Sequence, residues 1–170
     1  MALRPGRTTR KKERAYTRVS KRKPRQSYVV GVPYPSIHMF EMGTKGDYDC
    51  TLYLVSKREV QIRHNALEAA RIVAHKFLEK KLGLSYFLKI LVFPHHVIRE
   101  KPIAMGAGAD RYSRGMKMAF GRPSGMAAQM KKNQRIMKLQ INRKSVDIGK
   151  LALKKAGLKL PTRFSIEIEE

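Results

Sequence analysis

The sequence has one cysteine, Cys50, so it can form no disulfide within the chain and offers no cysteine pair for a structural zinc site. It has no apolar run near the roughly 20 residues that a membrane-spanning helix needs. Its basic N-terminus is not followed by the apolar segment of a secretory signal. These absences argue against secreted disulfide-rich proteins and integral membrane proteins, and we expect a soluble protein of the cytoplasm or a similar reducing compartment.

Acidic residues are also scarce, with 13 aspartates and glutamates against 37 lysines and arginines. The formal net charge is +24 and the isoelectric point is near 10.6. A compact body with this much unbalanced charge repels itself, so we expect a polyanion to neutralise it. Nucleic acid is the leading candidate, because its backbone releases condensed counterions when cations bind. An anionic membrane surface is the alternative, but it requires a strongly amphipathic helix or a lipidation signal, and the sequence shows neither.

Residues 1–30 are a strongly basic segment in which Glu13 is the only acid. No apolar periodicity runs through them, so we expect this extension to be disordered when the protein is alone. Its arginines favour a nucleic-acid partner, because guanidinium groups bind phosphates through two hydrogen bonds and stack on bases. A solvated tail without a partner is the alternative. The candidate RNA-binding residues of this extension are Arg4, Arg7, Arg10, Lys11, Lys12, Arg14, Arg18, Lys21, Arg22, Lys23 and Arg25.

Residues 31–170 show the alternation and periodicity of a single domain, whose length allows one sizeable core. Hydrophobic alternation and turn residues predict strands at 37–40, 50–55, 86–93, 97–103, 127–130, 135–141 and 164–169. Helical spacing of apolar residues predicts helices at 65–83 and 145–157. Asn65 is expected to cap the first helix as part of a capping-box pattern with Glu68, and Gly83 is expected to end it.

The first two predicted strands, 37–40 and 50–55, are expected to pair antiparallel through the turn between them. Strands outnumber helices, and several connections are too short for a parallel crossover. The predicted fold class is therefore α+β: a mainly antiparallel sheet with two helices packed on one face, which makes a sandwich. A basic N-terminal extension and a long glycine-rich loop are added to this domain.

The stretch GAGADRYSRGMKMAFGRPSG, residues 106–125, combines glycines with cations and has Asp110 as its only acid. A phosphate-binding Walker loop needs a lysine and a serine or threonine after its last glycine, but Arg122 and Pro123 follow Gly121. GAGADR supplies only two glycines of a dinucleotide fingerprint.

We therefore interpret this glycine-rich segment as a long functional loop that fits the contours of folded RNA. The alternative is a loop that covers the domain's own core, with methionines as fillers. The candidate contact residues of the loop are Arg111, Tyr112, Arg114, Lys117 and Arg122.

Histidines and carboxylates show no catalytic or metal-binding pattern. His95 and His96 are adjacent, and adjacent residues of a strand point to opposite faces, so they are poorly placed to share a metal. His38, His64 and His75 lack the spacing of a zinc-binding helix. Asp110, Asp147 and the serines form no recognisable triad. We expect no catalytic residue, no metal and no cofactor.

Four stretches in this order and spacing resemble one family: GVPYPSIHMFEMG at 31–43, NALEAARIVAHKF at 65–77, FPHHVIREKP at 93–102 and the glycine-rich stretch at 106–125. The sequence is similar to the archaeal and eukaryotic large-subunit ribosomal proteins called L-ten-e, the counterparts of bacterial L-sixteen. The resemblance implies an α+β sandwich in a cleft of large-subunit rRNA, and a cytoplasmic, ribosomal location. The segment corresponding to residues 103–122 would extend toward the peptidyl transferase centre, with Arg111, Arg114, Lys117 and Arg122 touching RNA.

The partners that the resemblance implies are large-subunit rRNA, transfer RNA in the aminoacyl site and neighbouring ribosomal proteins, with 5S rRNA as a further candidate. No membrane and no second copy of the chain is expected as a partner. Two other functions stay open from the residues alone. One is a small enzyme that binds a phosphorylated substrate with the glycine-rich loop, and the other is a protein that compacts DNA.

Overall fold

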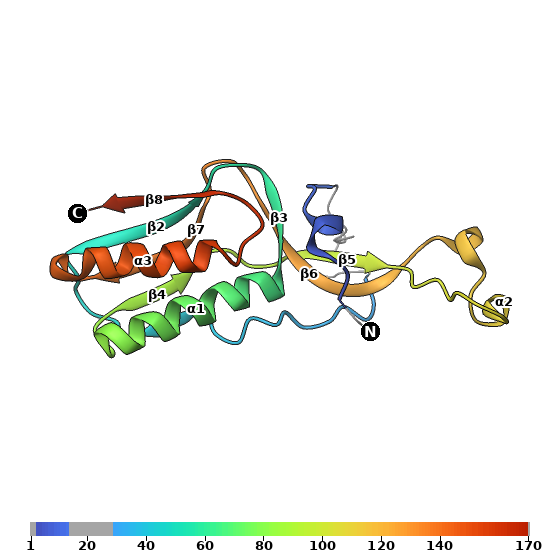
Figure 1. The fold of residues 1–170 in the computed structure, drawn as a ribbon, viewed down its shortest axis with the longest axis horizontal. Coiled ribbons are helices and arrows are strands. Elements are labelled where there is room, and N and C mark those ends of the chain that lie inside the picture. The colour runs from blue at the N-terminus through green and yellow to red at the C-terminus, as the bar shows by residue number, and fades with distance from the viewer. Residues whose placement is uncertain (1–2, 14–28, 170) are drawn as a thin grey trace, which may run out of the picture.

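The computed structural model describes residues 3–13 and 29–169. Within them the chain is α+β and forms two antiparallel sheets. The larger sheet is covered by two long helices, and the smaller sheet leads into a projection that points away from this body (Figure 1). The six candidate residues Arg14, Arg18, Lys21, Arg22, Lys23 and Arg25 lie outside the described residues.

The larger sheet has the strand order β1-β4-β7-β2-β8, and every neighbouring pair is antiparallel. Its strands are β1 (Glu41–Gly43), β4 (Phe87–Ile90), β7 (Arg135–Ile141), β2 (Cys50–Ser56) and β8 (Phe164–Glu169). Apolar residues dominate the central strands, and Leu52 of β2 lies opposite Leu139 of β7. Both of these side chains are fully buried.

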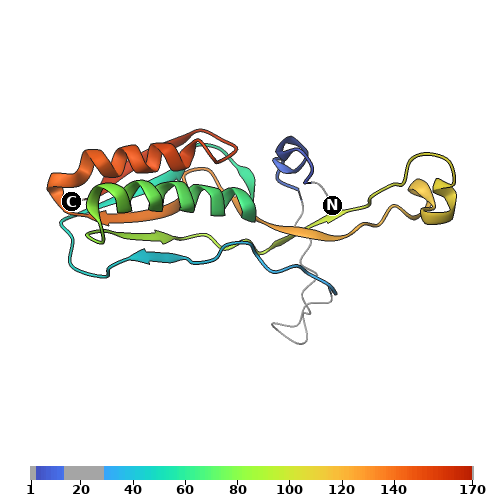
Figure 2. The same ribbon diagram turned by 60° about the horizontal axis from the view of Figure 1, so that its bottom comes forward.

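The two long helices, α1 (His64–Leu82) and α3 (Val146–Gly157), pack against each other on one face of this sheet (Figure 2). Leu67, Ala70 and Ala74 recur at helical spacing in α1 and are fully buried. Burying one such leucine contributes about 1.5–3 kcal/mol. Gly149 lets α3 approach the sheet closely, because a β-carbon there would collide with the side chain of Ile141.

The smaller sheet has the order β3-β6-β5 and is built from β3 (Val60–Arg63), β6 (Arg122–Met130) and β5 (His96–Glu100). Two short connections join it to the larger sheet: one runs from β2 to β3, and the other runs from β6 to β7. Residues 101–121 link β5 to β6 as the projection (Figures 1 and 2). It contains the short helix α2 (Ala109–Tyr112) and the 3-10 turn η2 (Gly115–Met118).

The prediction of one sheet, with residues 37–40 and 50–55 as paired strands, is wrong. Residues 37–40 form no strand; they are held by other contacts, such as the bond from the Ile90 N–H to the Phe40 carbonyl (2.8 Å) and the stacking of Phe40 on Phe93. β2 pairs instead with β7 and β8. β3 was not predicted, although Val60 and Ile62 are buried in alternation with half-buried neighbours.

The predicted cap of the first helix is also wrong, although the helix itself is confirmed. The helix begins at His64 without a side-chain cap, and Glu68 binds Arg71 and the N–H of His38 instead. Gly83 ends the helix as predicted, because its φ of 59° is open to glycine and its N–H bonds to the Glu79 carbonyl. Gly157 is the last residue of α3, and Leu158 is its cap.

Candidate nucleic-acid interface

The root of the projection depends on a close approach of its two arms. Glu100 at the end of β5 lies opposite Arg122 at the start of β6. A β-carbon on Gly121 would lie 2.7 Å from the Glu100 carbonyl carbon, which is closer than any side chain tolerates. Gly121 therefore allows the hairpin to close. Gly108 precedes α2 with φ 76°, a conformation that L side chains rarely adopt, so it turns the chain at the tip.

The projection presents its apolar side chains to solvent. Tyr112 is 87% exposed, Met105 is 94% exposed, and Met116, Met118 and Phe120 are also exposed. This placement excludes the alternative in which the loop covers the domain's own core. Exposed apolar side chains gathered in this way mark an interaction site.

Cations accompany these apolar groups. Arg111, Arg114 and Lys117 are exposed on the projection, and Arg122 is exposed at its root. The Arg99 guanidinium lies 4.2 Å from the centre of the Phe120 ring, a cation–π contact that steadies the returning arm. The structure thus brings Arg111, Tyr112, Arg114, Lys117 and Arg122 to one extended segment.

Residues 3–13 are the described part of the N-terminal extension. They lie beside the smaller sheet and contain the 3-10 turn η1 (Gly6–Thr9) (Figure 1). The Gln61 N–H donates to the Arg10 carbonyl (3.0 Å), and the Gln61 and Gln129 side chains donate to the Thr9 and Glu13 carbonyls. This ordered path differs from the expected disorder. Hydrogen bonds to its backbone carbonyls, mostly from side chains of the body, hold the segment rather than apolar burial, so hydrophobic periodicity could not reveal it.

The five candidate cations of this segment are all exposed. Arg4 lies 3.7 Å from Glu100, and Lys12 lies 3.2 Å from Glu59. Arg7, Arg10 and Lys11 have no ion pair within the described residues. Because the Arg63 side chain donates to the Arg4 carbonyl (2.8 Å), the segment is fastened next to the root of the projection.

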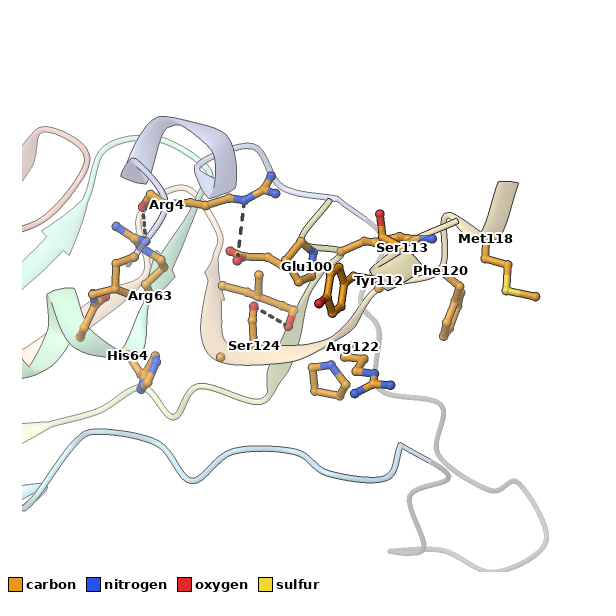
Figure 3. A pocket seen from close by; sticks show the side chains of 18 of the residues that line it. Arg4, Arg63, His64, Glu100, Tyr112, Ser113, Met118, Phe120, Arg122 and Ser124 are labelled. Atoms are coloured by element: carbon orange, nitrogen blue, oxygen red, sulfur yellow. Dashed lines mark hydrogen bonds and ion pairs between the residues drawn. The ribbon is translucent and has the colours of Figure 1, made fainter. Parts of the chain in front are cut away.

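A hollow of about 800 Å³ opens between the N-terminal segment, the start of α1, the strands β5 and β6, and the returning arm of the projection. Figure 3 shows Arg63 and His64 on one side of it and Tyr112 and Phe120 on the other. Its cations are Arg4, Arg63, Lys101, Arg114 and Arg122, and its acid is Glu100. The hollow is therefore cationic with aromatic walls.

His64 is held in place on one side of this hollow. The Ser36 N–H donates to its Nδ1 (2.7 Å), so the proton of the neutral ring lies on Nε2. Burial and the neighbouring Arg63 lower the pKa of His64, which keeps the ring neutral. A β-carbon at position 125 would lie 3.2 Å from Nε2, so Gly125 leaves the ring room. Sequence reasoning missed Arg63 and His64 as site residues, because nothing local sets them apart.

Several acids on the body are paired with cations of the same chain. Glu41 bonds Lys45 and Lys89, and these bonds lower the pKa of its carboxyl to about 2. On β8, Glu167 and Glu169 pair with Arg135. These acids do not offset the cations of the projection, whose acid is Asp110, or those of the hollow, whose acid is Glu100.

Metal and catalytic chemistry find no support in the part of the chain that the structure describes. No group of three or more histidine, cysteine, aspartate or glutamate side chains could hold a metal ion within residues 3–13 and 29–169. Asp147 pairs with Lys150 at 3.6 Å, and Asp110 lies in the first turn of α2. None of the helices in the described ranges is long and apolar enough to cross a membrane.

Comparison with known proteins places these features in a family. The family described as Ribosomal protein L16p/L10e matches residues 12–167. The "Large ribosomal subunit protein uL16" of Archaeoglobus fulgidus is 45% identical over 100% of this chain and 95% of its own length. The protein of the same name from Sulfolobus acidocaldarius is 45% identical over 99% and 94%, and that from Staphylothermus marinus is 48% identical over 81% and 80%. The chain therefore belongs to the ribosomal protein L16p/L10e family.

Proposed function

We propose that this protein is a structural constituent of the large ribosomal subunit, where it binds and organises rRNA and supports translation. The observation that carries this proposal is the projection, in which exposed arginines alternate with exposed aromatic and methionine side chains. Arginine and aromatic planes stack on unpaired bases, and guanidinium groups bind phosphates. The names of the relatives, all of which are large-subunit proteins, support the same function.

The proposed division of the chain follows its chemistry. Residues 1–30 serve as a basic rRNA-binding extension, and residues 31–170 form one α+β domain with a functional loop at 103–122. The domain serves as a helix-and-sheet sandwich that sits in a cleft of rRNA. Within the extension, the eleven cations from Arg4 to Arg25 bind phosphates. In the loop, Arg111, Arg114, Lys117 and Arg122 bind rRNA near the peptidyl transferase centre, and Tyr112 stacks there.

The further proposed partners are transfer RNA in the aminoacyl site, neighbouring large-subunit proteins and 5S rRNA. The exposed tip of the projection supports the transfer RNA contact, because a flexible finger without a core of its own can reach a bound RNA. The protein acts as a single copy. Membership of a family of ribosomal structural proteins decides against the alternative of a small phosphate-binding enzyme.

Sedimentation of cell lysate through a density gradient tests the proposal directly. We expect the protein to travel with the large subunit and with whole ribosomes. Its absence from ribosomal fractions at every stage of subunit assembly would contradict the proposal. A DNA-compacting protein is separated by binding at matched salt: we expect structured RNA to bind more tightly than duplex DNA, and equal binding would favour DNA compaction.

Salt dependence gives a second test on the purified chain. If about 6 to 10 phosphates are engaged, affinity for structured RNA falls by roughly 10³ to 10⁵ between about 50 and 200 mM salt. A response that is nearly flat would show that phosphate contacts do not drive binding.

A further inference from the structure

The hollow at the root of the projection has the size of a small-molecule site, although the proposed partner is a large polyanion. Its volume of about 800 Å³ lies within the roughly 300–1,000 Å³ of ligand pockets. An RNA double helix is too wide to enter a space of this size. A single nucleotide that has left its stack can enter it.

The walls supply the two chemistries that such a nucleotide needs. Tyr112 offers an almost fully exposed ring on the projection side, and base–aromatic stacking accepts any base. Arg63 supplies charge for the phosphate on the side opposite Tyr112, and Arg122 adds positive charge below the Tyr112 ring (Figure 3). Glu100 is the acid of the lining, and Arg4 already balances it at 3.7 Å.

Several of these groups are held in place before any ligand arrives. Arg63 is anchored by its bond to the Arg4 carbonyl, and His64 by the Ser36 N–H. The neutral His64 ring carries its proton on Nε2, which can donate to an acceptor on a base. Gly125 leaves the His64 ring its position, since a side chain there would press on the ring. Fixed donors lower the ordering cost of binding.

We propose that this hollow binds one nucleotide of rRNA that is unstacked from its helix, with the base against Tyr112 and the phosphate near Arg63. This inference rests on the proposed RNA-binding function and deepens it. The loop then does more than neutralise phosphates, because an extruded nucleotide fixes the register of the protein on its RNA. Direct contact with a base also allows selectivity that backbone contacts cannot give.

Two RNA hairpins with the same stem and the same number of phosphates test the proposal on the full chain. One carries a single bulged adenosine, and the other carries an abasic bulge at the same place. We expect the adenosine hairpin to bind about 5- to 150-fold more tightly, which is the range for stacking of one base on an aromatic side chain. Equal affinity for the two hairpins would contradict the proposal that the hollow binds an unstacked nucleotide.

Substitutions test whether Tyr112 is the residue that gives the preference for the adenosine bulge. Tyr112→Ala should abolish the preference for the adenosine bulge while the salt slope stays unchanged, and Tyr112→Phe should keep the preference. Tyr34→Ala is the matched control, because Tyr34 is also strongly exposed but does not line the hollow. If Tyr112→Ala still prefers the adenosine bulge, the base does not stack on Tyr112 and this part of the proposal is wrong. No measurable binding to either hairpin at low salt would instead contradict the RNA-binding function itself.

Discussion

The helix-covered body and the projection use the same residue types in opposite ways. Met130 and Met137 are fully buried in the core, whereas Met105 and Met116 on the projection are 94% and 68% exposed. A buried methionine fills gaps between strands and helices and stabilises the fold. An exposed one stabilises nothing until a partner covers it. The body therefore carries the stability of the chain, and the projection carries surface that is complete only in a complex.

Acidic residues are distributed unevenly between the two regions. Glu41, Glu167 and Glu169 on the body are paired with cations of the same domain. From residue 101 to residue 122 the only acid is Asp110. Repulsion within the projection is not relieved by the protein, so a polyanion relieves it. Separate tests of stability and RNA affinity should respond to changes in different regions.

The largest expected effect on stability comes from the body. Leu139 lies at the centre of β7 and is fully buried, so Leu139→Ala should lower the free energy of unfolding by about 2–5 kcal/mol. Urea unfolding measures it. Met116→Ala on the projection is the control and should change stability by about 0.5 kcal/mol or less. Similar losses in both variants would show that the projection contributes to the folded core.

The largest expected effect on RNA binding comes from the projection. Replacing Arg111, Arg114 and Lys117 by alanine removes about three phosphate contacts, so the salt slope should fall by about 2.7 and affinity near 0.15 M salt by about 100-fold. Filter binding at several salt concentrations measures both, and unfolding should not change.

A charge-matched control separates contact from net charge. Lys76, Lys80 and Lys154 are exposed on α1 and α3, and their replacement by alanine removes the same charge. We expect the projection to make the phosphate contacts that decide affinity for a short RNA, and charges on α1 and α3 more than about 8–10 Å from those phosphates are screened, so this variant should lose less than about 10-fold in affinity. Equal losses of RNA affinity in the two triple variants would show that net charge, rather than contact by the projection, decides binding.

A smaller effect is expected where the two regions join. Gly121→Ala places a β-carbon against the Glu100 backbone, so the ends of β5 and β6 must separate at a cost of about 1–3 kcal/mol. Hydrogen exchange should quicken near the root of the hairpin and stay slow in β7. Gly46→Ala is the matched control, because its β-carbon would come no closer than 3.8 Å to a neighbouring atom. Unchanged exchange in Gly121→Ala would mean that the root can widen freely.

The smallest effect concerns the ion pairs of the body. Bonds from Lys45 and Lys89 lower the pKa of Glu41 from its usual 4.5 to about 2 in the folded protein. The contribution of Glu41 to stability is therefore present above about pH 4.5 and is lost as pH falls toward 2. Glu41→Gln should be less stable than the natural chain near neutral pH and equal to it near pH 2. The difference is small, because exposed ion pairs are weak.

Elements with strong local patterns could be predicted from the sequence. The strand at 135–141 has the predicted bounds, because its apolar residues and flanking turn are contiguous in the chain. The helix at 64–82 follows from its apolar stripe and from Gly83. Residues 37–40 could not be assigned correctly from the sequence, because Phe40 contacts Phe93 through tertiary packing rather than through a hairpin.

The candidate site was only partly predictable. Arg111, Tyr112, Arg114, Lys117 and Arg122 could be singled out because they share one segment with glycines. Arg63 and His64 could not, because they join the hollow only when the start of α1 lies beside β5 and β6. The docking of residues 3–13 was equally hidden, since glutamine side chains and carbonyl groups leave no periodic signal.

Composition and local pattern by themselves determined that this chain is a small, strongly cationic α+β protein with a glycine-rich segment suited to a polyanion, because charge and periodicity are properties of contiguous residues. Tertiary structure alone decided that the strands divide into two sheets and that four distant segments enclose a hollow at the root of the projection. The physical reason is that strand pairing and cavity walls depend on which surfaces meet, and those contacts join residues far apart in the chain.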